Sequence, residues 1–329
     1  MATQTLALTR LAASAWGCSV RRAKELYTKV IRSVLAYGAS AWHKVADTKK
    51  GPALSLTTVQ NSCLRTVTGA YKATPQCYLE TEAAVPPLDL YLSARAASFE
   101  IPTETTGKLQ LLRGACIKAA EIINRERSAR RRRQRRPQGA TSETPVTLWP
   151  SDAQLASAKQ WLGGQTVEKA LKEKWEQRWF HAVTPTRGRR ELAAESPPDC
   201  GACHRYDDML KHEASVLMQA CTGRIGLRSF LFTCRVPDVP TPLCNCGEGR
   251  ETAEHLILYC KDFKESREHL ATQLAPNSLR TRRDLAALTT KKDTARLIVK
   301  WLLRTGRLPL YKRAMEVGGP PEHVNLFRP

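Results

Sequence analysis

Three cysteines and one histidine in a short stretch of this chain form a complete ligand set for a metal ion. They are Cys244, Cys246, His255 and Cys260, in the pattern C-x-C-x8-H-x4-C. Zinc prefers thiolate and imidazole ligands, and a structural zinc site fills all four tetrahedral positions with protein groups. The sequence therefore predicts a structural zinc site.

The spacing of the four residues also predicts local structure. In an extended segment Cys244 and Cys246 point to the same side, and Gly247 and Gly249 permit the tight turn that a chelate loop needs. Positions five apart on an α-helix face about 140° away from each other, so we expect the helix that holds His255 to end before Cys260.

Two alternatives to this ligand set stay open. Cys234 is close enough in sequence to replace one ligand, which makes the fourth position the least certain. A helix with one buried histidine and scattered core cysteines would need no metal, because free cysteine is often a small buried apolar residue.

A second cysteine pair, Cys200 and Cys203, is followed by His204 and matches the covalent haem pattern C-x-x-C-H. Haem attachment takes place in exported compartments, and the N-terminus has no convincing secretory signal. A second zinc site that also uses His212 lacks a matching second half. We interpret these residues as unpaired thiols in a loop.

The sequence Tyr206-Asp207-Asp208 is similar to the paired aspartates of polymerases, which hold two magnesium ions. Such a pair needs a β-hairpin and a further aspartate, whereas a helix is predicted directly after Asp208. We expect the two aspartates to cap that helix. The chain offers no complete catalytic constellation.

Charge indicates the kind of partner. Among 329 residues, 52 Lys and Arg face 31 Asp and Glu, giving a net charge of +21, which favours binding to RNA or DNA. No apolar run approaches the length of a membrane span, so no membrane partner is expected. Without a secretory signal, eleven cysteines fit reduced thiols in an intracellular protein of the nucleus or cytoplasm.

Helical periodicity dominates the chain and predicts a mainly α fold. From Ala23 to Trp42 apolar residues recur every three or four positions, which predicts one long amphipathic helix. A second helix is expected to end at Gly69, and a third to begin after Pro86-Pro87. We interpret residues 1–105 as an N-terminal helical bundle.

Residues 106–150 read as a basic helix and linker, with eight arginines between Arg125 and Arg136. The segment is either a solvated arm or folds against a polyanion. Its candidate nucleic-acid contacts are Arg130, Arg131, Arg132, Arg133, Arg135 and Arg136.

The remaining chain divides into three predicted segments: 151–199 with tryptophan-containing helices and a linker, 200–275 around the predicted zinc site, and 276–329 with C-terminal helices and a tail. Helices are expected at Asp152 to Leu162 and Val167 to His181. Their aromatic residues are interpreted as core rather than as a stacking platform for bases. These residues are Trp161, Trp175, Trp179 and Phe180.

Two separated parts of the sequence resemble one protein family. The segments Leu26 to His43, Val59 to Pro75 and Val85 to Leu92 are similar to the thumb region of reverse transcriptases from fungal non-LTR (LINE-type, Tad-like) retrotransposons. The segment Thr222 to Cys260 resembles the C-terminal zinc-knuckle region of the same polyproteins. The resemblance implies a thumb-like bundle, a basic linker and a zinc-knuckle module.

The chain also departs from that family. Members carry fingers and a palm with catalytic aspartates before the thumb, and many carry a ribonuclease H domain after it; neither is found here. Only Cys244, Cys246, His255 and Cys260 carry over by resemblance, as zinc ligands.

The resemblance leads to three functional hypotheses. The first is a truncated reverse-transcriptase fragment that acts as a zinc-dependent remnant and binds RNA or DNA without sequence preference. The second is the C-terminal part of an active RNA-directed DNA polymerase whose palm comes in trans or from upstream sequence. The third is a relic with no selected role. In the first, zinc presents four further candidate contacts to phosphates: Arg224, Arg228, Arg235 and Arg250.

Overall fold

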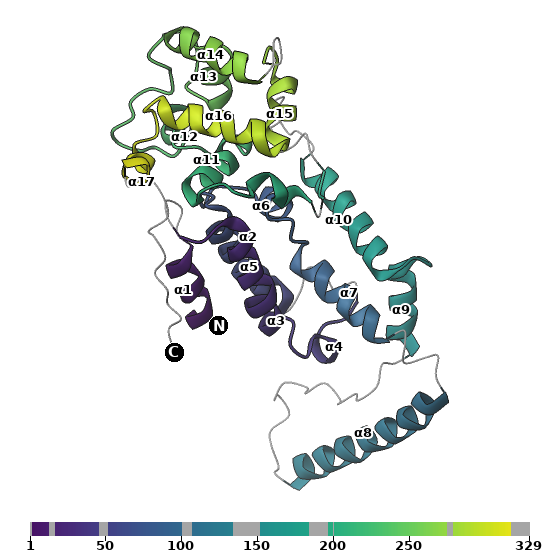
Figure 1. Ribbon diagram of the computed structural model, residues 1–329. Coiled ribbons are helices and arrows are strands. Elements are labelled where there is room, and N and C mark those ends of the chain that lie inside the picture. The colour runs from purple at the N-terminus through teal and green to yellow at the C-terminus, as the bar shows by residue number, and fades with distance from the viewer. Residues whose placement is uncertain are drawn as a thin grey trace, which may run out of the picture. The chain divides into compact units, whose positions relative to one another are not determined.

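The computed structural model describes residues 2–12, 17–45, 52–100, 107–133, 152–183, 197–199, 201–274 and 279–316. Regular structure in these residues is helical (Figure 1). Their β-type pairings are two isolated bridges, Ala12 with Gly17 and Leu243 with Arg250. The protein is therefore mainly α, which confirms the predicted fold class.

The N-terminal half holds eleven of these elements. They are α1 (Ala2–Leu11), α2 (Val20–Leu26), the π-helix η1 (Tyr27–Ile31), α3 (Arg32–Leu35), α4 (Ala39–Trp42), α5 (Pro52–Thr68), α6 (Gln76–Ala83), α7 (Leu88–Glu100), α8 (Gly107–Arg133), α9 (Asp152–Leu162) and α10 (Val167–Val183).

The C-terminal half is built from shorter helices. They are the 3-10 helix η4 (Ala202–Tyr206), α11 (Lys211–Cys221), α12 (Arg228–Thr233), α13 (Ala253–Leu258), the 3-10 helix η5 (Lys261–Phe263), α14 (Lys264–Leu274), α15 (Arg282–Thr290), α16 (Lys292–Arg304), the 3-10 helix η6 (Pro309–Tyr311) and α17 (Lys312–Glu316). Within the described chain, every helix is too short or too polar to cross a membrane.

Contacts divide the chain into two compact units. Unit 1 comprises Met1–Leu35, Thr58–Pro86 and Glu176–Pro329, and unit 2 comprises Ala36–Thr57 and Pro87–Trp175. Unit 1 thus combines stretches that are far apart in sequence. The five-segment organisation described above stays a prediction.

The predicted long helix from Ala23 to Trp42 is wrong in its C-terminal part. The helical run of α2, η1 and α3 ends at Leu35, and α4 is a separate turn. Gly38 lies between them with φ of 62°, in the left-handed region that glycine adopts readily. An amphipathic pattern cannot reveal this break, because the apolar spacing continues across it.

Other predicted boundaries are confirmed. Helix α5 ends one residue before Gly69, α7 begins directly after Pro87, and α9 and α10 match the predicted tryptophan helices within two residues.

The aromatic residues of α9 and α10 divide into two kinds. Trp161, Trp175 and Trp179 are buried, which confirms their core role, but Phe180 is 61% exposed, so its assignment to the core is wrong. Trp175 and Trp179 are four residues apart and share one helix face, whereas Phe180 is turned about 100° from Trp179.

Unit 2 has a small core of alanines around one tryptophan. Helices α7 and α9 and the first turns of α10 meet there, and buried Ala94, Ala97, Ala158 and Ala170 pack with Trp161. Small residues on these faces let the helices approach closely enough to enclose a large side chain.

Helix α11 is the centre of unit 1, because all its residues from Lys211 to Cys221 are buried. Its polar side chains find partners in other segments. Lys211 Nζ donates to the carbonyl oxygens of Thr66 and Val67 at 3.0 and 2.6 Å, at the C-terminal end of α5. Gln219 Nε2 donates to Gly69 O at 2.9 Å. The negative end of α5 therefore faces a buried cation.

Gly69 is required where α5 approaches α11. Its φ is 72°, and a Cβ atom added there would lie 1.9 Å from Ser215 Oγ on α11. Glycine thus serves the helix end and the close approach at once.

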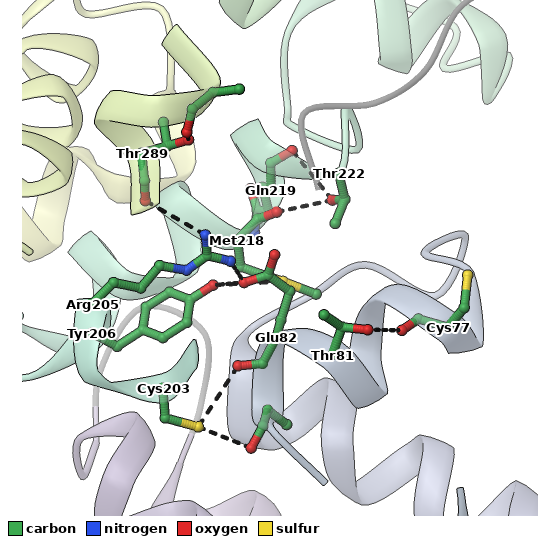
Figure 2. A network of polar contacts seen from close by, with 12 residues as sticks. Cys77, Thr81, Glu82, Cys203, Arg205, Tyr206, Met218, Gln219, Thr222 and Thr289 are labelled. Carbon is green, nitrogen blue, oxygen red and sulfur yellow. Dashed lines mark hydrogen bonds and ion pairs between the residues drawn. The ribbon is translucent and has the colours of Figure 1, made fainter. Parts of the chain in front are cut away.

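A buried network of polar contacts links α6, η4 and α15 in unit 1 (Figure 2). The Glu82 carboxylate forms an ion pair with Arg205 and accepts a hydrogen bond from the Tyr206 hydroxyl. Arg205 Nη1 also donates to Thr289 O at 3.5 Å. Burial raises the pKa of Tyr206, so its hydroxyl keeps the proton that it donates to Glu82.

Candidate metal centre

Cys244 and Cys246 lie on a tight loop whose ends, Leu243 and Arg250, pair through an isolated β-bridge. The Cys244 N–H donates to Gly249 O at 2.8 Å and holds the two arms of the loop together. The loop therefore presents both thiols from a short, hydrogen-bonded turn.

The two glycines of this loop have different roles. Gly247 has φ of 78° and its N–H donates to Cys244 O at 3.0 Å, so it makes the turn itself. A Cβ atom on Gly249 would lie 3.3 Å from His255 Nδ1, so Gly249 lets the loop approach the imidazole. The predicted use of glycine in a chelate loop is consistent with this geometry.

The other two ligands come from the end regions of α13. Thr252 caps its N-terminus, and Thr252 Oγ1 accepts a hydrogen bond from the His255 N–H at 3.0 Å. The helix ends at Leu258, and the Cys260 N–H donates to His255 O at 2.8 Å. The prediction that the helix ends before Cys260 is confirmed. The ending returns the Cys260 thiol to the side of the imidazole.

The four candidate ligand atoms converge on one point. All lie within 4.8 Å of one another, with Cys244 Sγ 3.6 Å from Cys260 Sγ and Cys246 Sγ 3.2 Å from His255 Nε2. In a tetrahedral site with metal–sulfur bonds of about 2.3 Å, two sulfurs are about 3.8 Å apart. The described geometry fits a four-coordinate metal ion.

Burial and hydrogen bonding shift the pKa values of the three thiols in different directions. Burial raises the pKa of the Cys244 thiol and raises that of Cys260 to about 12, whereas a hydrogen bond from the Glu248 backbone lowers the pKa of Cys246. Two buried thiols therefore resist ionisation unless a cation lies between them. A bound metal ion supplies that charge, since metal binding releases thiol protons.

The sequence did not reveal the residues that hold this loop against its surroundings. Glu251 is buried, and its carboxylate accepts a hydrogen bond from the Arg228 N–H at 3.0 Å and lies 3.7 Å from Arg307 Nη1. Arg267 Nη1 donates to Cys260 O at 2.8 Å. Arg228 and Arg307 are distant from Glu251 in sequence, so no local pattern marks these partners.

Cys234, the alternative ligand, is exposed and does not belong to the converging group. Among the described residues, Cys244, Cys246, His255 and Cys260 form the one group of three or more His, Cys, Asp or Glu side chains with this convergence.

The second cysteine motif forms no comparable cluster in the residues that the structure describes. Cys203 Sγ donates to Ala83 O at 2.9 Å, and His204 Nδ1 lies 3.0 Å from a carboxylate oxygen of Asp207. Cys200 lies outside the described residues. Cys203 and His204 thus bond to separate partners and do not converge on one point.

The prediction that the paired aspartates cap α11 is wrong. Asp208 has φ of 62° and forms an ion pair with Lys292. Helix α11 begins later, and the Leu210 N–H at its start donates to the Glu213 carboxylate at 2.9 Å. The chain turns at Asp208 before the helix starts, so neither Asp207 nor Asp208 occupies the capping position.

The structure places the candidate nucleic-acid contacts in three situations. Arg130 to Arg133 end helix α8, but their side chains, like all of Arg135 and Arg136, lie outside the described residues. Arg224 is partly buried. Arg228 donates to Asn245 Oδ1, which lies in the segment 243–260, called the metal loop below.

Arg235, beside the metal loop, and Arg250, within it, are both exposed, and the Arg250 Nε donates to Ser229 Oγ at 3.1 Å. These two arginines are the candidate contacts that the described structure presents to solvent.

Comparisons with protein-family models, curated proteins and solved structures found no match to this chain. The resemblance to retrotransposon reverse transcriptases therefore stays a prediction from the residues.

Proposed function

We propose that this protein is a fragment of a non-LTR retrotransposon reverse transcriptase in which a structural zinc ion organises a nucleic-acid-binding module. The observation that carries the proposal is the convergence of three thiols and one imidazole within 4.8 Å. Such a donor set is assembled for a metal ion far more readily than for packing alone.

Zinc is the ion that this donor set favours. Three thiolates and one imidazole are soft ligands in the number and spacing of a closed tetrahedral site. Four protein donors leave no position for a reactive water, so the ion has a structural rather than a catalytic role.

Positive charge supports the proposed partner. The net charge of +21 favours a polyanion, and exposed Arg235 and Arg250 lie next to the loop that the ion organises. Contacts from arginine to phosphates act on any sequence, so binding to single-stranded RNA or DNA should be sequence-independent and sensitive to salt.

Metal analysis of matched variants tests the proposed ion. The purified protein should contain one equivalent of zinc, Cys246→Ser should lose it under mild chelation, and Cys234→Ser should retain it. Cys234 is a suitable control because it is an exposed cysteine outside the cluster. Equal zinc retention by both variants would exclude Cys246 as a ligand.

A salt titration tests the proposed partner. Affinity for single-stranded RNA should fall steeply as salt rises, because each phosphate contact releases counterions. The Cys246→Ser variant should bind more weakly than Cys234→Ser, since the loop that presents Arg250 loses its ion. A flat salt response would contradict nucleic-acid binding.

Family membership has its own test. Genomic sequence upstream of the codon for Met1 should contain palm motifs of a reverse transcriptase, intact or decayed. Unrelated coding sequence with an independent promoter there would argue against the proposed origin and would leave the zinc site unaffected.

A further inference from the structure

An open pocket of about 500 Å³ lies between the end of α12 and the metal loop. Its lining residues are Phe232, Thr233, Arg235, Val236, Val239 and Arg250. The lining therefore combines an apolar floor with two cations and contains no carboxylate. The volume falls in the range of about 300–1,000 Å³ that is usual for small-molecule sites.

Arg235 is held in this pocket by an unusual backbone position. At the end of α12 the Arg235 N–H donates to Phe232 O at 3.0 Å, and the Val236 N–H donates to Leu231 O at 3.1 Å. This pair of hydrogen bonds is a Schellman motif, in which Arg235 stands where glycine is usual. Its φ of 56° is unfavourable for an L-residue with a side chain. An arginine is present at a position where backbone conformation favours glycine.

Arg250 reaches the same pocket from the metal loop. Its Nε donates to Ser229 Oγ at 3.1 Å, and the Ser229 N–H donates to Glu251 O at 3.2 Å. The loop that carries Cys244 and Cys246 is therefore bonded to the first turn of α12. One guanidinium comes from each side, and the ion-binding loop fixes one of them.

The lining specifies the chemistry of a ligand. Phe232 is 41% exposed and, with Val236 and Val239, offers apolar and aromatic surface to a flat group. Arg235 and Arg250 offer charged donors to an anion attached to that group. An unpaired nucleobase with its adjacent phosphate has both parts, and aromatic side chains stack on bases of any sequence.

We infer that this pocket binds one unpaired nucleobase and its neighbouring phosphate of a single-stranded nucleic acid. The inference rests on the proposed function and adds the site: the base lies against Phe232 and the valines, and the phosphate lies between Arg235 and Arg250. Binding at this site should favour single strands over duplex, because a paired base cannot enter.

The test separates base from phosphate with two probes of equal charge, a fluorescent oligouridylate and an abasic ribose-phosphate oligomer of the same length. Phe232→Ala should weaken binding of the oligouridylate about tenfold and leave the abasic oligomer unchanged, since stacking on one base is lost. Arg235→Gly should weaken both, because it removes a phosphate contact.

Two controls separate loss of the phosphate contact from loss of folding and from loss of one positive charge. Arg235→Gly relieves the positive φ, so its melting temperature should equal or exceed that of the parent. Arg283→Ala, at an exposed position on α15, removes the same charge away from the pocket and should change both affinities less than Arg235→Gly does.

Each outcome has one meaning. If Phe232→Ala leaves the ratio of the two affinities unchanged, or if Arg235→Gly behaves like Arg283→Ala, the pocket inference is wrong while nucleic-acid binding still stands. If the parent binds neither oligomer, the proposed function fails as well. Stronger competition by a phosphopeptide than by oligouridylate would assign the pocket to a protein partner and overturn the inference.

Discussion

Helix α11 and the metal loop, residues 243–260, lie in the same compact unit but are stabilised in different ways. Every residue of α11 is buried, and its polar groups bond to backbone atoms of α5 and to Gly69. In the metal loop Leu243, Asn245 and Gly247 are exposed. The ligand atoms of its four candidate residues lie within 4.8 Å of one another. Packing orders the helix, whereas the loop gathers four donor atoms that could hold a metal ion.

The difference between these two regions indicates which of them can carry solvent-exposed arginines. Around α11, Lys211 and Arg205 are buried, and a buried cation needs a dedicated partner. A loop that an ion organises needs no large apolar core, so its outer face is free to carry Arg250, and exposed Arg235 lies beside it at the end of α12. The following predictions test that contrast, beginning with the largest expected effect.

Removal of the ion should disorder the loop and leave α11 intact. Structural zinc stabilises small domains by roughly 10–16 kcal/mol, so chelation should abolish local structure around the ligands. Amide hydrogen exchange should become fast at Cys244, His255 and Cys260 after chelation and stay slow across α11. Equal loss of protection in both regions would show that α11 depends on the ion too.

Disruption of the buried ion pair between Glu82 and Arg205 should destabilise the packed region and leave the metal site intact. Glu82→Ala leaves the buried guanidinium of Arg205 without its counter-charge and the Tyr206 hydroxyl without an acceptor. Removing one partner of a buried pair costs about 3–5 kcal/mol, which urea unfolding would measure. Zinc affinity of the folded protein should be unchanged.

A double variant controls for this effect. Glu82→Leu combined with Arg205→Met replaces both charges by apolar groups and should recover most of the stability, as buried pairs often allow. If the double variant is as unstable as Glu82→Ala, loss of packing rather than an unpaired charge is the cause.

The sequence predicted the metal loop better than it predicted the core around α11. Local spacing was sufficient for Cys244, Cys246, His255 and Cys260, because all four ligands lie in one short segment. It also predicted that the helix after His255 must end early, since helix geometry allows no other way for Cys260 to return.

Long-range partners were beyond the reach of local patterns. Glu82 and Arg205 are charged residues in two short helices, α6 and η4, and nothing in the local sequence marks them as a buried pair. The same holds for Lys211, whose charge alone favours a solvent-exposed position. Its two carbonyl partners on α5 become visible only when α5 and α11 are packed together.

Lys211 provides a pH-dependent test of the packed region. Burial lowers the pKa of Lys211 from 10.5 to about 8. Between these values the unfolded chain binds more protons than the folded chain, so this group makes stability rise with pH from about 8 to 10.5. The rise should reach about 3 kcal/mol relative to Lys211→Met.

The measurement is the difference between the two unfolding free energies across that range. Both proteins should carry Cys18→Ser, because the Cys18 thiolate raises the pKa of Lys211 and because Cys18 is itself a titratable group. A flat difference would show that folding leaves the pKa of Lys211 unchanged, and a falling difference would show that folding raises it; either result would contradict the prediction.

The smallest expected effect concerns the cap of α13. Thr252→Ala removes the oxygen that accepts the His255 N–H, and loss of an N-cap costs about 1 kcal/mol. Because the capped residue is itself a candidate ligand, this cost should appear as roughly fivefold weaker zinc affinity in a competition titration.

Thr281→Ala is the matched control, since Thr281 Oγ1 caps α15 in the same manner by accepting from the Asp284 N–H at 3.2 Å. Its loss should lower the free energy of unfolding by a similar amount without changing zinc affinity. In both caps a threonine Oγ1 accepts the backbone N–H three residues further on, so a difference in zinc affinity reports on the position of His255. Equal zinc affinity in the two variants would mean that the ion orders α13 without help from its cap, which would place even more of the stability of the loop on the metal.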